Sequence, residues 1–179
     1  MKPKLIGLTG YAQSGKSTVA EYLSSNHSYD RVSFASRLKG MLGLGLGLTI
    51  DELYGAKKDL PCERLLGVTP RHAMQTLGTE WGRDMIHPDL WCSIALENIQ
   101  RNKTAYVVID DVRFVNEAEL IHKAGGLVIR INRSITAASE HPSETSIDQI
   151  IPHTHIFNTG SMGNLCASID DLMKGFVNV

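Results

Sequence analysis

Runs of apolar residues alternate with amphipathic, helix-forming stretches along the chain. The runs at 5–8, 104–109 and 127–133 predict buried strands, and shorter runs at 31–35 and 155–157 predict two more. Strands that are apolar at successive positions are typical of parallel sheets covered on both faces. The pattern therefore predicts an α/β fold, a parallel sheet with helices on both faces, and ligands at the carboxyl ends of its strands.

The stretches between the strands predict helices from their apolar period and their end signals. We expect helices at 16–25, 51–54 and 115–124, and others that begin at Ser36, at Thr69–Pro70, at Pro88–Asp89 and after Asn158–Gly160. Ser36 and Thr69 are residue types typical of N-caps. The glycine–leucine alternation at 43–48 leaves two alternatives, a poor or mobile helix and a tightly packed one.

The first strand leads into a glycine-rich loop at 10–17, with the sequence GYAQSGKS, and then into a helix. Gly10, Gly15, Lys16 and Ser17 have the spacing of a phosphate-binding loop. The glycines let the backbone curl so that its N–H groups point at phosphates, and the helix adds its positive end. Lys16 can reach the β- and γ-phosphates, and the Ser17 hydroxyl can bind Mg²⁺. This loop predicts a nucleoside triphosphate site, and the candidate contacts are Gly10, Gln13, Ser14, Gly15, Lys16, Ser17 and Thr18.

The strand at 104–109 runs directly into Asp110 and Asp111. An acidic residue at the end of an apolar strand is the second signature of proteins with a phosphate-binding loop, because its carboxylate holds Mg²⁺ or the waters around it. We therefore expect Ser17 and Asp111 to be the protein's contributions to a magnesium site.

The helix that begins at Thr69–Pro70 has an unusual polar side. At about 100° per residue, one side carries Ala73, Met74, Leu77 and Trp81, and the opposite side carries Arg71, Gln75, Gly78 and Gly82. A stripe of one arginine, one glutamine and two glycines suits a surface against which a flat ligand lies. The alternative is that the helix ends at Gly78.

Length and composition fit one domain over 1–179, with 36–99 as an insertion between core strands and the polar stretch 134–151 as a mobile flap. The formal net charge of −1 does not favour a nucleic-acid polymer as partner. No stretch is long and apolar enough for a membrane span, and no signal peptide precedes the first strand. Three distant cysteines suit free thiols in the cytoplasm. The histidines are scattered and lack a companion set at ligand spacing, so we expect no structural zinc site.

These motifs, in this order, resemble the bacteriophage deoxynucleoside monophosphate kinases, which have the nucleoside monophosphate kinase fold. Besides the phosphate-binding loop, the resemblance rests on the segments at 34–39, 71–80, 89–91, 111–117, 141–144 and 158–161. It covers nearly the whole chain. It implies transfer of the γ-phosphoryl group of ATP to a deoxynucleoside 5′-monophosphate, a five-stranded parallel core, an insertion that holds the monophosphate, and a lid.

The resemblance also implies roles for individual residues. Lys39, Arg71 and Arg113 correspond to a clamp on the monophosphate, and Asp111 would organise Mg²⁺ or the acceptor phosphate. Arg133 corresponds to a lid arginine over the transferring phosphoryl group, and the loop at Asn158 and Gly160 would lie near the adenine. We add Gln75, Trp91 and Glu144 as candidate contacts to the acceptor, with core packing as an equal alternative for Trp91.

Three other functions remain to be compared with this one. A dephospho-coenzyme A kinase would share the fold, and an assay with both acceptors separates the two. A regulatory GTPase would need a guanine-binding Asn-Lys-x-Asp motif after a later strand, whereas the Asn102–Ala105 stretch lacks the aspartate and precedes its strand. A simple ATP-binding module would lack the arginines of an acceptor clamp. The sequence leaves open whether the protein forms a homodimer. If it is encoded by a phage, we expect it in the host cytoplasm.

Overall fold

The computed structural model describes residues 2–101, 106–133 and 145–177, and its chain divides into two compact units. The first unit consists of Met1–Ser33 and Ala95–Val179, and the second of Phe34–Ile94. Helix α5 (Leu90–Arg101) begins in the second unit and ends in the first.

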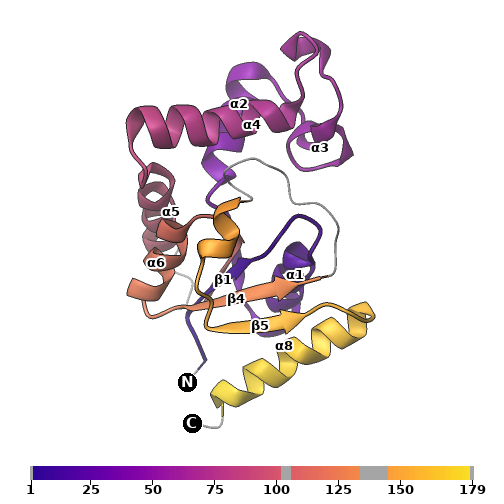
Figure 1. The fold of residues 1–179 in the computed structure, drawn as a ribbon, viewed down its shortest axis with the longest axis vertical. Helices are drawn as coiled ribbons and strands as arrows, with labels where there is room; N and C mark the ends of the chain where they lie inside the picture. Colours follow the sequence, from indigo (N-terminus) through magenta and orange to yellow (C-terminus); the bar gives the residue numbers. More distant parts are fainter. Residues whose placement is uncertain (1, 102–105, 134–144, 178–179) are drawn as a thin grey trace. The chain divides into compact units, whose positions relative to one another are not determined.

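The first unit is built on a five-stranded sheet, in the order β2-β3-β1-β4-β5. Figure 1 shows β1, β4 and β5 next to one another in this sheet. Its strands are β1 (Leu5–Thr9), β2 (Asp30–Val32), β3 (Val107–Val112), β4 (Leu127–Asn132) and β5 (Thr154–Phe157). Every pairing in the sheet is parallel. This confirms the expected five-stranded parallel sheet, and it places β1, whose five residues are all buried, at the centre.

Helices cover both faces of this sheet. Side chains of α1 (Lys16–His27) and α8 (Met162–Val177) share a core with Ile6 and Leu8 of β1. Between these two residues, Gly7 faces the other way, where a Cβ atom would overlap Ile121 of α6 (Val115–Lys123). Burial of one large aliphatic side chain contributes about 1.5–3 kcal/mol, so this two-sided packing fixes the central strand and the loop that follows it.

The expected helix ends and strand ends need small corrections in this unit. Strand β2 ends at Val32, so residues 33–35 are not part of it. The expected flap at 134–151 lies outside the described residues over 134–144, but its end is packed. Residues Ser146–Gln149 form a 3₁₀ turn, η4, in which Ile147 is fully buried, and Ile150 is also buried. The polar composition of this segment concealed its two core side chains.

The second unit is helical. It contains α2 (Ser36–Leu46), α3 (Ile50–Leu53), the 3₁₀ turns η1 (Ala56–Asp59) and η2 (Glu63–Leu65), α4 (Pro70–Thr76) and η3 (Leu77–Ile86). Thr69 caps α4 as expected, because its side chain accepts a hydrogen bond from the backbone N–H of His72. Ser36 is instead the first residue of α2, after Ala35. The glycine–leucine segment is helical and ends at Gly47, which has a φ of 65°.

The prediction for the second half of the Thr69 helix was wrong. From Leu77 to Ile86 the chain winds as a π-helix with i→i+5 hydrogen bonds, so each residue turns through a smaller angle than in an α-helix, and the positions that face inward differ from those of an α-helical period. Gly82 therefore turns inward with Leu77 and is buried, whereas Trp81 is 38% exposed. The stripe predicted from an α-helical period does not exist beyond Thr76.

The two glycines of that stripe contact a tryptophan in different ways: Gly78 accepts its indole N–H, and Gly82 makes room for its ring. The indole N–H of Trp91 donates to the carbonyl of Gly78 at 2.7 Å, and a Cβ on Gly82 would lie 2.6 Å from the indole nitrogen. Trp91 is 2% exposed and belongs to the core of the second unit, with Leu38 and Leu42. Its predicted contact with an acceptor base is therefore corrected to core packing.

Candidate nucleotide-binding site

The loop between β1 and α1 has the backbone geometry of an anion cradle. Gly10 and Gly15 adopt φ angles of 135° and 110°, a backbone conformation that residues with a side chain rarely adopt. Gln13 also has a positive φ, of 62°. The left-handed geometry at Gly15 directly precedes the first turn of α1, so the N-terminal end of this helix opens onto the loop. The sequence folds this way because the apolar strand is followed by Gly10 and Gly15, which can adopt a positive φ.

Lys16 lies inside the loop. Its side chain donates to the carbonyl of Gly10 at 2.5 Å and to that of Tyr11 at 2.7 Å, and the residue is only 8% exposed. Such carbonyl partners hold an ammonium group in place without neutralising its charge. Phosphate oxygens would offer this ammonium group stronger, charge-assisted hydrogen bonds than the two carbonyls do.

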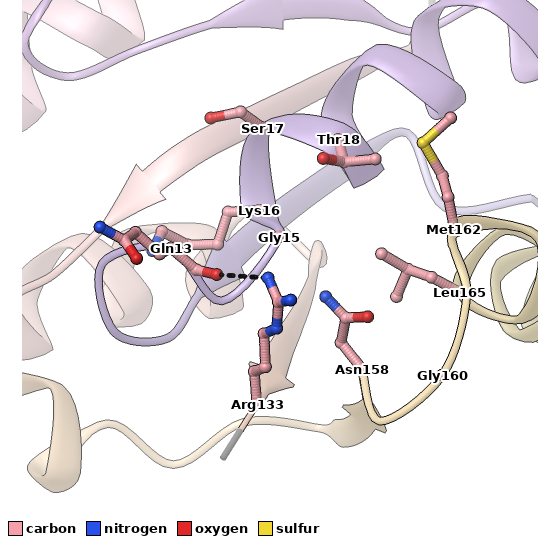
Figure 2. Close-up of a pocket in the computed structure, with 10 residues that line it drawn as sticks. All are labelled: Gln13, Gly15, Lys16, Ser17, Thr18, Arg133, Asn158, Gly160, Met162 and Leu165. Atoms are coloured by element: carbon pink, nitrogen blue, oxygen red, sulfur yellow. Dashed lines mark hydrogen bonds between the residues drawn. The ribbon is translucent and has the colours of Figure 1, made fainter. Parts of the chain in front are cut away.

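A pocket of about 360 Å³ opens beside this loop (Figure 2). It is lined by Gln13, Gly15, Lys16, Ser17, Thr18, Arg133, Asn158, Gly160, Met162 and Leu165. All but Met162 and Leu165 were candidates from the sequence. Met162, which is 69% exposed, begins α8, and Leu165, one turn further along that helix, is buried. A methionine two residues after the candidate Gly160 is the sequence signal that could have indicated Met162.

Two side chains from neighbouring strand ends support the cradle. Arg133 follows β4, and its Nη1 donates to the carbonyl of Gln13 at 3.4 Å (Figure 2). Asn158 follows β5, and its Nδ2 donates to the carbonyl of Ser14 at 2.9 Å. The same amide nitrogen would lie 2.7 Å from a Cβ on Gly15, so only glycine fits there. Both side chains hold the outer, carbonyl side of the loop and leave its N–H groups for a ligand.

Asp111 lies within β3 and not after it, because the strand continues to Val112. The register pairs Val112 with Thr9, so the end of β3 lies next to the residue that precedes the loop. The Ser33 hydroxyl donates to Asp111 at 2.7 Å, and the neighbouring Asp110 pairs with Arg31 at 2.6 Å. Asp111 thus borders the start of the loop, although it does not line the pocket.

These oxygen atoms fit a magnesium ion. Mg²⁺ prefers hard oxygen ligands, takes one or two from the protein and completes its shell with water and phosphate. Ser17 offers a hydroxyl at the pocket, and Asp111 offers a carboxylate at the adjacent strand end. In the described part of the chain, no three His, Cys, Asp or Glu side chains gather into a metal site.

Arg113 is presented by a capped turn. The carboxylate of Glu117 accepts the backbone N–H of Arg113 at 2.7 Å and that of Phe114 at 3.1 Å, at the start of α6. Glu117 is 2% exposed, and the two backbone donors compensate for burial of its charge. The sequence reasoning did not assign this role, although a glutamate at the third position of a helix is a recognised capping signal.

The remaining acceptor candidates belong to the second unit. The ammonium of Lys39 lies 4.0 Å from the centre of the Tyr54 ring. Arg71 makes a two-pronged ion pair with Asp59, through Nε to Oδ1 and through Nη2 to Oδ2, the latter at 3.0 Å. The hydrogen bonds from Arg71 hold the pKa of the Asp59 carboxyl below its usual range. Gln75 lies half-buried on α4, and Glu144 lies outside the described residues.

The central parallel strand, the glycine-rich loop and the lysine inside it together define a P-loop nucleotide-binding protein. Among the helices of the described residues, none is long and apolar enough to cross a membrane. The fold is similar to the crystal structure of TT1252 from Thermus thermophilus, with a TM-score of 0.53, 15% identity and 98% of each chain covered.

Sequence comparisons identify the family. The family model for deoxynucleotide monophosphate kinase matches residues 67–169. A protein of Acanthamoeba polyphaga mimivirus, assigned as a deoxynucleotide monophosphate kinase, is 38% identical over 160 residues, which are 82% of this chain and 83% of that protein. The deoxynucleoside-5′-monophosphate kinase of Escherichia phage T5 is 33% identical over 109 residues, 56% of this chain and 44% of the phage protein. The chain belongs to the deoxynucleotide monophosphate kinase family.

Proposed function

We infer that the protein is an ATP-dependent deoxynucleoside monophosphate kinase, which transfers the γ-phosphoryl group of ATP to a deoxynucleoside 5′-monophosphate and releases ADP and the diphosphate. The observation that carries this inference is the phosphate cradle around Lys16 in a chain of this family. The 38% identity to the mimivirus protein extends over most of both chains, so it supports the activity for the whole protein and not for the loop alone.

The reaction needs charge neutralisation and positioning more than proton transfer. An oxygen of the acceptor phosphate, already anionic, forms a bond to the γ-phosphorus, while the bond from that phosphorus to the β–γ bridging oxygen breaks. Lys16 would stabilise the negative charge that develops on the bridging oxygen and the γ-phosphate. Arg133, which donates to the carbonyl of Gln13 and lines the same pocket, would add a second positive charge. When bound through Ser17 and Asp111, Mg²⁺ would supply further neutralisation of the phosphates.

We propose that the pocket beside the loop receives the ATP side of the reaction. The N–H groups of the loop, from Gly10 to Thr18, would bind the phosphates, and the exposed Ser17 would face the metal. Asn158 and Gly160 would border the adenosine, with Met162 and Leu165 offering apolar contact to it. The mixture of a polar cradle and two apolar side chains suits a ligand that has phosphates at one end and an aromatic base at the other.

We propose that the stretch 36–99, which covers most of the second unit (Phe34–Ile94), holds the acceptor. Lys39, Arg71 and Gln75 are its candidate contacts, and the guanidinium of Arg71 is already arranged to grip an oxyanion with two nitrogens. Arg113 remains a candidate for the acceptor phosphate, with its backbone fixed by Glu117. We expect the enzyme to act where ATP and free nucleotides occur, in the cytoplasm.

A coupled assay with ATP, Mg²⁺ and each common ribo- and deoxynucleoside monophosphate tests the proposal. We expect turnover with at least one deoxynucleoside monophosphate and none with dephospho-coenzyme A. The variant Lys16→Ala should lose turnover by orders of magnitude and remain folded, because Lys16 acts on charge that develops in the reaction. The matched control is Lys123→Ala, which removes an exposed lysine on α6 that pairs with Glu119 at 3.4 Å. Near-normal turnover in folded Lys16→Ala would contradict the proposed chemistry.

A further inference from the structure

Three side chains connect the phosphate-binding loop to the turn that precedes β5. Tyr11, the second residue of the loop, donates its phenol proton to Oδ2 of Asp148. The other carboxylate oxygen, Oδ1, accepts from Nη2 of Arg130 at 2.5 Å. The guanidinium of Arg130 also lies 5.7 Å from the centre of the Tyr11 ring. Tyr11, Asp148 and Arg130 thus form a closed set of contacts, the Tyr11 clamp.

Each side of the clamp is anchored in the core of the first unit. Arg130 belongs to β4, where it is paired in register with Thr9 of β1, and its side chain is 14% exposed. Its Nη1 also donates to the carbonyl of Ile147 at 3.3 Å, and Ile147 is fully buried. Asp148 itself is 60% exposed, and an isolated pair at such a position contributes only about 0–1 kcal/mol. The Asp148 side chain is already restricted by the buried Ile147 next to it. It therefore loses less conformational freedom on pairing with its two partners than an isolated, exposed carboxylate would lose.

The protonation states agree with this geometry. The hydrogen bond to Asp148 raises the pKa of Tyr11, and the hydrogen bond from Tyr11, followed by that from Arg130, lowers the pKa of Asp148. A neutral phenol therefore donates to an ionised carboxylate, which is the stronger, charge-assisted type of hydrogen bond.

The backbone of Tyr11 matters for the lysine of the loop. Its carbonyl accepts from Lys16 at 2.7 Å and from the backbone N–H of Ser14 at 3.2 Å. Gly10 and Gly15 bound this loop with positive φ angles, and glycine is the residue with the most backbone freedom to lose. The pattern of a phosphate-binding loop leaves the residue after the first glycine unspecified, so nothing in the motif itself restrains this peptide. A fixed Tyr11 side chain supplies that restraint.

We propose that Asp148 is a positioning residue of the nucleotide site: together with Arg130 it holds Tyr11, and so keeps the loop in its phosphate-binding shape before ATP arrives. The proposal rests on the proposed function to the extent that the loop binds ATP. Restraint of a site before binding increases affinity, because less conformational entropy is lost on binding. The clamp should therefore act on ATP affinity and leave the chemical step nearly unchanged.

The test uses Tyr11→Phe, which removes one oxygen atom, Asp148→Asn, and the double variant. Calorimetry with ATP alone should show a Kd about five- to tenfold higher for each single variant, where tenfold equals about 1.4 kcal/mol. The loss of ATP affinity in the double variant should be no larger than the loss in whichever single variant binds ATP more weakly. For Asp148→Asn, the kcat at saturating ATP and the affinity for the monophosphate should stay within about twofold, because Asp148 contacts neither reacting group.

The matched control is Tyr22→Phe. The Tyr22 phenol also donates to a carboxylate, that of Asp170 at 2.8 Å, but it joins α1 to α8 and has no contact with the loop carbonyls in the described structure. We expect its ATP affinity to stay within about twofold of the wild type, even if its melting temperature falls as far as that of Tyr11→Phe.

Three results would overturn the proposal: unchanged ATP affinity in Tyr11→Phe and Asp148→Asn, an equal loss in Tyr22→Phe, or losses that multiply in the double variant, since residues of one clamp cannot act independently. The result is separable from the proposed function. A wild-type protein that binds ATP but phosphorylates no deoxynucleoside monophosphate would refute the function, and the ATP affinities would still decide the role of Asp148.

Discussion

The ion pair between Arg71 and Asp59 allows a quantitative test of the proposed acceptor site. Arg71 lies in the first turn of α4 and directs two guanidinium nitrogens at the carboxylate of Asp59. The two side chains are 39% and 53% exposed, so the pair should contribute less than about 1 kcal/mol to folding. Arg71→Ala should therefore leave the protein folded, with a melting temperature close to that of the wild type.

The effect on acceptor binding should be much larger. A lost charge-assisted hydrogen bond that leaves a charged partner unpaired costs about 2–3 kcal/mol, which corresponds to a Kd about 30- to 150-fold higher for the monophosphate. Arg71→Lys should recover only part of this loss, because an ammonium group cannot make the two-pronged contact. ATP affinity should barely change, since Lys16 and the loop hold that nucleotide.

Asp59→Asn provides the matched control. A phosphate that binds Arg71 must compete with the Asp59 carboxylate, and an exposed pair of this kind is worth about 0.2–1 kcal/mol. Removal of the competing charge should therefore improve monophosphate affinity by about 1.5- to 5-fold.

Calorimetric titration of each nucleotide separately, on variants of unchanged melting temperature, measures all of these effects. A fall in ATP affinity with unchanged monophosphate affinity in Arg71→Ala would show that the acceptor site has been assigned to the wrong residues. A large loss of monophosphate affinity in Asp59→Asn would show that Asp59 assists the acceptor and does not compete with it.

Two further predictions concern packing and pH. Gly82→Ala should destabilise the protein by about 1–3 kcal/mol in urea unfolding, because its Cβ would lie 2.6 Å from the Trp91 indole nitrogen. Gly78→Ala is the control and should cost less, since the nearest atom to its Cβ would be 3.5 Å away. Equal effects of the two substitutions would refute the packing argument. Burial lowers the pKa of His153 below 6.5, and the Nδ1 of this residue accepts the Val128 N–H at 3.0 Å. The contribution of His153 to the free energy of unfolding should therefore be complete above pH 6.5 and decline as the pH falls through the lowered pKa. His153→Asn should flatten this decline between about pH 7.5 and 5.5, and an unchanged pH profile of stability would refute the argument.

The sequence was sufficient wherever the relevant residues are neighbours in the chain. The spacing of Gly10, Gly15, Lys16 and Ser17 lies within eight positions, and their backbone requirements are local, so the pattern alone predicted the loop (Figure 2). The sheet followed from strands that are apolar at successive positions, which need cover on both faces. Thr69 and Pro70 marked the start of α4 because a cap is satisfied by the next turn of the same helix.

The sequence failed where one assumption about local geometry was wrong. A hydrophobic period identifies the buried side of a helix only if the angle per residue is known. The π-helical winding of Leu77–Ile86 changed that angle and exchanged the positions of Trp81 and Gly82. Trp91, proposed as a contact to the acceptor base, then proved to fill the space that Gly82 leaves.

Contacts between distant residues were decided by the tertiary structure alone. Tyr11 and Asp148 are 137 positions apart, and they meet because β1 and β4 are neighbours in the sheet and a buried isoleucine fixes the turn that carries Asp148. Asp59 meets Arg71 because a 3₁₀ turn ends beside the first turn of α4. A single sequence fixes which side chains carry charge, but the strand order and the packing of turns determine which of these charges are paired before any nucleotide binds.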